Sequence, residues 1–134
     1  MASPDLELQG SIVARLKSFS MLTALVADRI YDQPPSSVSY PYISLGESDV
    51  QRSDGVGLNS CDVYLTIHAW SSSPGYPEVK RVADAVAEAL HLFPLPISSN
   101  QLISINHRQT RVFRDQDGIT SHAVIEFLAF VQKP

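Results

Sequence analysis

The sequence predicts an α+β fold, an antiparallel sheet of about four strands with two helices packed on one face. Three features of the sequence support this prediction: two segments with helical spacing of apolar residues, a long alternating segment between them, and an Asp-Gly pair between two alternating segments near the C-terminus. The 134 residues are 44% hydrophobic and 18% charged, which is typical of a folded domain of ordinary size. We therefore expect residues 1–134 to form a single domain.

The N-terminal region is expected to begin with an amphipathic helix over Asp5–Phe19, because its apolar side chains recur on one helical stripe. Ser20 is expected to cap a short helical turn that ends near Leu25. The chain should then become extended at Asp28–Tyr31, until Pro34 and the proline after it stop regular strand pairing.

Two strands are expected in the middle of the chain. The first covers Tyr42–Val50, with Gly46 as the site of a bulge, and the second covers Cys61–Trp70. The segment Gln51–Ser60 between them holds two glycines and few apolar residues, so it is expected to be a mobile loop. Strict alternation assigns one face of the second strand to the core, namely Cys61, Val63, Leu65, Ile67 and Ala69.

The second half of the chain is expected to form a helix and a hairpin. Pro77 suits the first turn of a helix that ends near Leu90, with apolar residues at spacings of three and four. Two strands follow, Gln101–Arg114 and Ile119–Gln132, and Gly118 supplies the positive φ of the tight turn between them. The last strand is apolar on both faces, so both of its sides are expected to be covered.

Charge and composition disfavour several classes of protein. The formal net charge of −4 and the pI near 5.4 disfavour a dedicated nucleic-acid binder, which needs a basic surface. The sequence has no apolar run of bilayer length and its N-terminal residues do not resemble a signal peptide, so we expect no membrane contact and assembly in the cytoplasm. Cys61 is the single cysteine, so it forms no internal disulfide and is expected to be buried.

No catalytic, cofactor-binding or metal-binding residues are predicted. His68 and His122 are expected to share the sheet face away from the helices, whereas His107 should point the other way, so the three histidines do not converge on a metal. The sequence lacks a nucleophile elbow. The segment Gly55–Gly57 has neither the third glycine nor the following Lys-Ser/Thr of a phosphate-binding loop.

The candidate functional residues are therefore residues of an interface. One group, Tyr64, His68 and Trp70, lies on the expected outer face of the sheet, which is covered either by partner subunits or by the Pro-rich segment as a third layer. Basic residues crowd the strand that ends at Arg114, and they suggest a solvated or intersubunit surface or, less favourably, contact with DNA. The complete set of interface candidates is Arg52, Asp54, Tyr64, His68, Trp70, Arg111, Arg114, Asp115 and Asp117.

Several short strings, taken together in their order and spacing, resemble one protein family over nearly the whole chain. They are Ile12–Lys17, Ala27–Asp32 with Pro34-Pro35, Tyr40–Glu47, Ile67–Ser71, Arg81–Val86, and Arg111–Asp115 with Asp117-Gly118. This pattern is similar to the tail-completion or tail-terminator family of long-tailed bacteriophages, prophages and gene transfer agents. The composition of residues 51–60 departs from that pattern.

The resemblance implies a structural protein of the virion tail with no enzymatic activity and no cofactor. Its expected form is a homo-hexameric ring that caps the tail tube protein, stops tube polymerisation and meets the head-tail connector or head-completion protein. DNA would only pass through the bore, and an acidic bore would keep it from sticking. The alternatives are a head-completion or tail-tube subunit of the same particle, or a small binding protein or enzyme.

Overall fold

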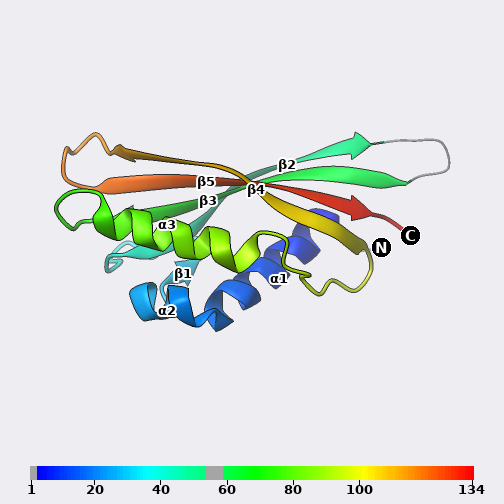
Figure 1. Ribbon diagram of the computed structural model, residues 1–134, viewed down its shortest axis with the longest axis horizontal. Helices are drawn as coiled ribbons and strands as arrows, with labels where there is room; N and C mark the ends of the chain where they lie inside the picture. The colour runs from blue at the N-terminus through cyan, green and yellow to red at the C-terminus, as the bar shows by residue number, and fades with distance from the viewer. Residues whose placement is uncertain (1–2, 54–58) are drawn as a thin grey trace.

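The computed structural model describes residues 3–53 and 59–134, which form one five-stranded sheet with three helices on a single face (Figure 1). The strand order is β1-β2-β3-β5-β4. In chain order the elements are α1 (Pro4–Ser18), α2 (Ser20–Val26), β1 (Ile30–Tyr31), β2 (Tyr42–Ser53), β3 (Ser60–Ser71), α3 (Pro77–Leu90), β4 (Gln101–Arg114) and β5 (Ser121–Gln132).

The α+β class is confirmed, but the expected four antiparallel strands and two helices are wrong in detail. The sheet is mixed, because the two-residue strand β1 pairs in parallel with β2 through Ile30 and Ile43. A strand this short shows no periodicity in the sequence, so only its extended backbone was predictable. The expected helical turn is the separate seven-residue helix α2, which begins at Ser20 and has Phe19 at its N-cap, with no side-chain cap.

The segment between β2 and β3 is shorter than expected. Residues Gln51–Ser53 continue β2, and Arg52 pairs in register with Cys61. These β2 residues are polar, and this end of the strand projects beyond the helices. Hydrophobic alternation in the sequence therefore does not reveal that the strand continues. The bulge at Gly46 is confirmed by a register shift between Leu45 and Ser48. Asp54 lies outside the described residues.

The helix-facing side of the sheet forms the core. The five alternating residues of β3 that were assigned to the core are all buried, and their neighbours on β5 are buried with them. The largest fully buried side chain is that of Phe127, which lies opposite Leu65. Burial also raises the pKa of the Cys61 thiol, which agrees with the expected structural role of this residue.

Polar contacts of Glu7 and Arg15 help to attach α1 to the rest of the fold. The Glu7 carboxylate accepts hydrogen bonds from the Ser99 N–H, from the side chains of Asn100 and Ser98 and from the Asn100 N–H, and these bonds lower its pKa to about 2. Arg15 donates to the carbonyl of Ala89 at 2.8 Å, near the end of α3. These contacts fix the helices on one side of the sheet and leave the other side as the candidate functional surface.

Candidate interaction surface

The outer face of the sheet, which points away from the helices, carries side chains from all five strands. The registers place on it Tyr31 from β1, Tyr42 and Ser44 from β2, Tyr64, Thr66, His68 and Trp70 from β3, His122, Val124, Leu128 and Phe130 from β5, and Arg111 and Phe113 from β4. The common face predicted for Tyr64, His68 and Trp70 is therefore confirmed. Their contact with a partner remains a prediction.

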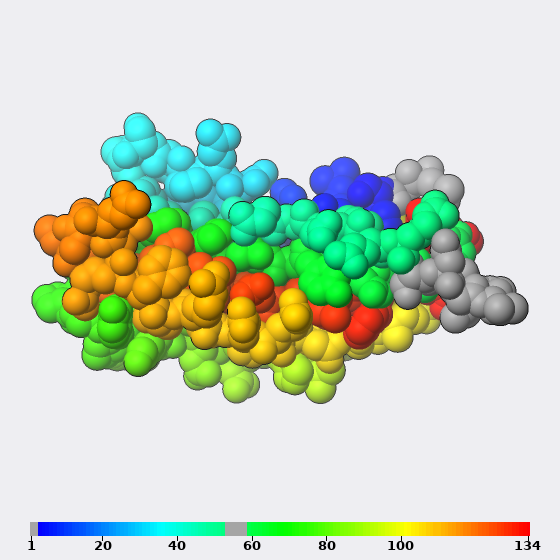
Figure 2. All heavy atoms as spheres, turned by 90° about the horizontal axis from the view of Figure 1, so that it is seen from above, coloured from blue at the N-terminus to red at the C-terminus, as the bar shows by residue number. Residues whose placement is uncertain are grey.

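The outer face is not covered by a third layer of the described residues. Figure 2 looks onto this face, where atoms of β2, β3, β5 and β4 lie open, while the Pro-rich segment 33–41 lies along one border. The alternative of a Pro-rich covering layer is thus wrong. The expectation that both sides of the last strand are covered holds for its helix side and, on the outer side, only near its start, where His122 and Val124 are buried; further along, Phe130 is 38% exposed.

An aromatic row crosses the outer face near the end that holds the β4–β5 hairpin. The Trp70 ring stacks on the His122 ring with centroids 3.7 Å apart, and it lies 6.0 Å from the Tyr42 ring on its other side. The row extends to Tyr31 on β1 and to Phe113 on β4, so it reaches both edges of the sheet. Stacked rings of this kind form a rigid, partly apolar surface.

This row was not foreseen, because it depends on strand order and register. Sequence alternation places Trp70 and His122 on the same side of their strands. It does not show that β3 and β5 are neighbours or that Trp70 lies directly opposite His122. The one available signal was the spacing of aromatic residues near the same end of several strands.

His122 of the row also forms a pair with His68 on the same face of the sheet. His68 Nδ1 lies 2.7 Å from His122 Nε2, a hydrogen-bond distance, so one of the two nitrogens donates and the other accepts. Burial lowers the pKa of both imidazoles, and for His122, with the nearby positive charges of His68 and Arg111 contributing, the pKa falls to about 4. The pair is therefore neutral at neutral pH. Gly46 leaves room for His68, because a Cβ built on this glycine would lie 2.6 Å from His68 Nε2.

The predicted basic strand is divided between the two faces of the sheet. Arg111 lies on the outer face, where its Nε is 3.9 Å from a carboxylate oxygen of Glu126. Arg108 lies at a bulge, and its guanidinium is 5.3 Å from the centre of the Tyr64 ring. Arg114 points to the opposite face, over the ring of Tyr76. Thus the candidates Arg111 and Arg114 do not form one cluster.

The hairpin candidates Asp115 and Asp117 lie together in the β4–β5 turn. The Asp115 N–H donates to the Thr120 carbonyl at 2.7 Å, and Gly118 has the expected positive φ of 72°. The Asp117 carboxylate accepts hydrogen bonds from Ile119 and Thr120, which lower its pKa. It therefore stabilises the turn.

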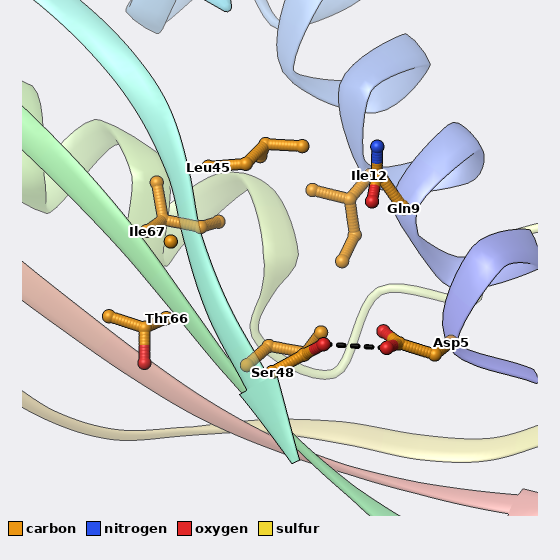
Figure 3. Close-up of a pocket in the computed structure, with 9 residues that line it drawn as sticks. Asp5, Gln9, Ile12, Leu45, Ser48, Thr66 and Ile67 are labelled. Atoms are coloured by element: carbon orange, nitrogen blue, oxygen red, sulfur yellow. Dashed lines mark hydrogen bonds between the residues drawn. The ribbon is translucent and has the colours of Figure 1, made fainter. Parts of the chain in front are cut away.

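The described residues contain no group of three or more metal-ligating side chains, and His107 faces the helices as predicted, within hydrogen-bond range of Thr110. The cavity between α1 and β2, drawn in Figure 3, has a volume of about 30 Å³ and is lined by residues such as Ile12, Leu45 and Ile67. At its mouth the Ser48 hydroxyl donates to Asp5. A space of this size holds one or two water molecules, so it is no substrate pocket. None of the described helices is long and apolar enough to cross a membrane.

Comparison with known proteins gives consistent results. The family model of tail completion protein gp17 matches residues 10–132. The tail completion protein gp17 of Bacillus phage SPP1 is 24% identical over 119 residues, which are 89% of this chain and 87% of the relative. A chain from the virion of a native gene transfer agent particle superposes with a TM-score of 0.91, at 24% identity, covering 98% of this chain and 99% of that chain. The structure of bacteriophage SPP1 gp17 gives a TM-score of 0.63, at 22% identity, with 92% and 88% covered. These two structures share the fold described above.

Proposed function

The chain belongs to the tail completion protein gp17 family, which matches residues 10–132, and from this membership we propose that it is a tail terminator. Members of this family are structural components of the virion tail and not enzymes. The chain is therefore a structural tail protein of a bacteriophage or gene transfer agent particle. Within that tail, we propose a more specific task, which is to end the growth of the tail tube.

In the proposed assembly, six copies form a ring that caps the last ring of the tail tube, stops further polymerisation and offers a surface to the head-tail connector. The observation that carries this proposal is the family match over nearly the whole chain. The open outer face of the sheet supports it, because a row of aromatic rings that is partly exposed is suited to contact with another protein.

The proposed contacts with neighbours use three regions: the segment around residues 51–60, the hairpin with Asp115 and Asp117, and the outer face around Tyr64 and Trp70. The residues of the chain carry a net formal charge of −4, so a ring of six copies is strongly acidic. An acidic bore would let DNA pass without binding it, since like charges suppress phosphate contacts. DNA would thus meet this ring only while it passes through the bore.

The test is electron microscopy of particles produced without this gene, with the wild-type gene restored in trans as the control. A tail terminator predicts overlong tails that carry no heads. Tails of normal length that remain unattached would assign the chain to head completion instead, and the absence of tails would indicate a tube subunit. Normal tails joined to heads would refute all three assignments.

A further inference from the structure

Each of the strands β2 and β4 contains a run of consecutive exposed residues. In β2 the six consecutive residues Glu47–Arg52 are exposed, and in β4 the four consecutive residues Arg108–Arg111 are exposed. Side chains of a strand point alternately to its two faces, so consecutive exposure means that neither face is covered there. Both stretches therefore leave their side chains open to a neighbouring molecule.

Neither stretch has a further strand beside it within residues 3–53 and 59–134. On one side, β1 pairs only with Ile43 and Ser44 of β2 and leaves the rest of that edge without a partner strand. On the other side, β4 is the last strand of the sheet. The segment after α3 covers part of its edge, because the Leu92 N–H donates to the Ile105 carbonyl and the His107 N–H donates to His91. The open part of β4 therefore begins at Arg108.

The two open edges carry opposite charge. Strand β4 contains three arginines, Arg108, Arg111 and Arg114, all of them exposed, and no acidic residue. The exposed stretch of β2 contains two acidic residues, Glu47 and Asp49, and one basic residue, Arg52, at its end. Further acidic groups lie near the same edge, since Asp5 accepts a hydrogen bond from Ser48 and exposed Asp32 follows β1. Figure 2 shows the two strands along opposite borders of the outer face.

Charged edge strands commonly protect a sheet from pairing with other sheets. Here the charges exclude only pairs of like edges, because two β4 edges bring arginines together and two β2 edges bring carboxylates together. A β4 edge and a β2 edge attract each other. The charge pattern thus selects a head-to-tail contact, which closes into a ring when the rotation between copies permits.

We propose that β4 of one copy lies beside β2 of the next, with Arg108–Arg114 against Glu47–Gln51, so that the sheets of neighbouring copies join. This inference rests on the proposed ring and names the contact that builds it. The alternation of antiparallel pairs from β2 through β3 and β5 to β4 makes β2 and β4 run in opposite directions. Copies arranged head-to-tail then pair these strands antiparallel, with backbone hydrogen bonds and ion pairs between arginines and carboxylates.

The acidic hairpin is a weaker candidate for the partner of the arginines. The carboxylate of Asp117 already accepts hydrogen bonds from the turn, including one from the Thr120 hydroxyl at 2.6 Å. By contrast, the Glu47 side chain is 80% exposed, and its nearest ion-pair partner, His68 Nε2, is 3.9 Å away. Glu47 can therefore pair with an arginine of a neighbouring copy without breaking a close contact within its own chain.

The experiment reverses the charge of each edge in particles that lack the native gene and are supplied with a variant. The variant Arg108→Glu with Arg111→Glu makes both edges acidic, so its incorporation into tails should fall by about tenfold or more, since like charges in contact cost several kcal/mol. Adding Glu47→Arg and Asp49→Arg reverses both edges together and should restore incorporation. The matched control, Lys17→Glu with Arg81→Glu, has the same charge change at exposed helix positions and should incorporate normally.

A cross-link provides a second measurement that does not depend on charge. Asp49→Cys and Arg111→Cys are combined in a Cys61→Ala background, and assembled particles are oxidised. The proposal expects a ladder of covalent oligomers on a non-reducing gel, with at most dimers from either cysteine alone.

Normal incorporation of the Arg108→Glu, Arg111→Glu variant, or a paired-cysteine variant that assembles without forming a ladder, would overturn the edge contact and leave the terminator proposal intact. Wild-type particles in which the chain forms no ring would overturn the ring proposal itself.

Discussion

The two faces of strand β3 show how one sheet serves two purposes. On the inner face, Val63 and Ile67 are almost fully buried beneath the helices. On the outer face, Tyr64 and Trp70 alternate with them and remain partly exposed. Apolar burial holds the inner face together, whereas ring stacking and hydrogen bonds order the outer face without covering it. Strand β3 therefore contributes to stability through one face and is open to recognition on the other.

Two phenylalanines of β5 give the sharpest test of this division, since they differ mainly in the face they occupy. Phe127 is 1% exposed on the inner face, so Phe127→Ala should lower the free energy of unfolding by about 3 to 5 kcal/mol. Phe130→Ala on the outer face should lower it by less than about 1 kcal/mol. Urea unfolding followed by circular dichroism measures both values. Equal losses for the two variants would show that the outer face also carries the stability of the fold.

A smaller effect is expected from the glycine that seats the histidine pair. Gly46→Ala places a methyl group against the His68 ring, which cannot turn away without losing its hydrogen bond to His122. The new Cβ also lies 3.0 Å from the Thr66 carbonyl. We expect a loss of about 1 to 3 kcal/mol in the same unfolding measurement, as for other overpacked sites. Gly10→Ala serves as the control, because its Cβ would meet no atom within 4 Å. A Gly46→Ala protein as stable as the control would mean that the ring is free to move.

Much of the inner face was predictable because periodicity reports it directly. The alternation in β3, the helical spacing in α3 and the Asp-Gly turn before β5 each encode a local structure that tertiary packing then uses. Strand β1 and the end of β2 were missed for a shared reason. A two-residue strand and a polar strand end carry no hydrophobic period, and their pairing depends on residues distant in the sequence.

The candidate surface was predictable only in part. Alternation correctly placed Tyr64, His68 and Trp70 on one face, and it also implies that Arg111 and Arg114, three residues apart in one strand, face opposite ways. The face of Arg108 could not be read from alternation, because it lies at a bulge, where an extra residue changes which side chains share a face. Such bulges are decided by packing and leave no reliable mark in a single sequence.

Acid should weaken the outer face selectively, because its histidine pair is held neutral. The folded-state pKa of His122 is about 4, whereas the ordinary value is 6.5. Between these two values the unfolded chain binds a proton that the folded chain does not, so stability falls as the pH decreases from 6.5 towards 4. Glu47 beside His68 and Asp115 near His122 reduce this effect, and Arg111 increases it.

The expected loss is about 1 kcal/mol or more between pH 7 and pH 5, allowing for partial solvent screening of the pair. It is measured as the difference in urea unfolding free energy at the two pH values. The variant His122→Gln removes one member of the pair and should show a smaller difference. The intrinsic fluorescence of Trp70 follows the same change, because the indole stacks on His122. A variant with the same pH dependence as the wild type would show that the acid sensitivity does not come from the histidine pair.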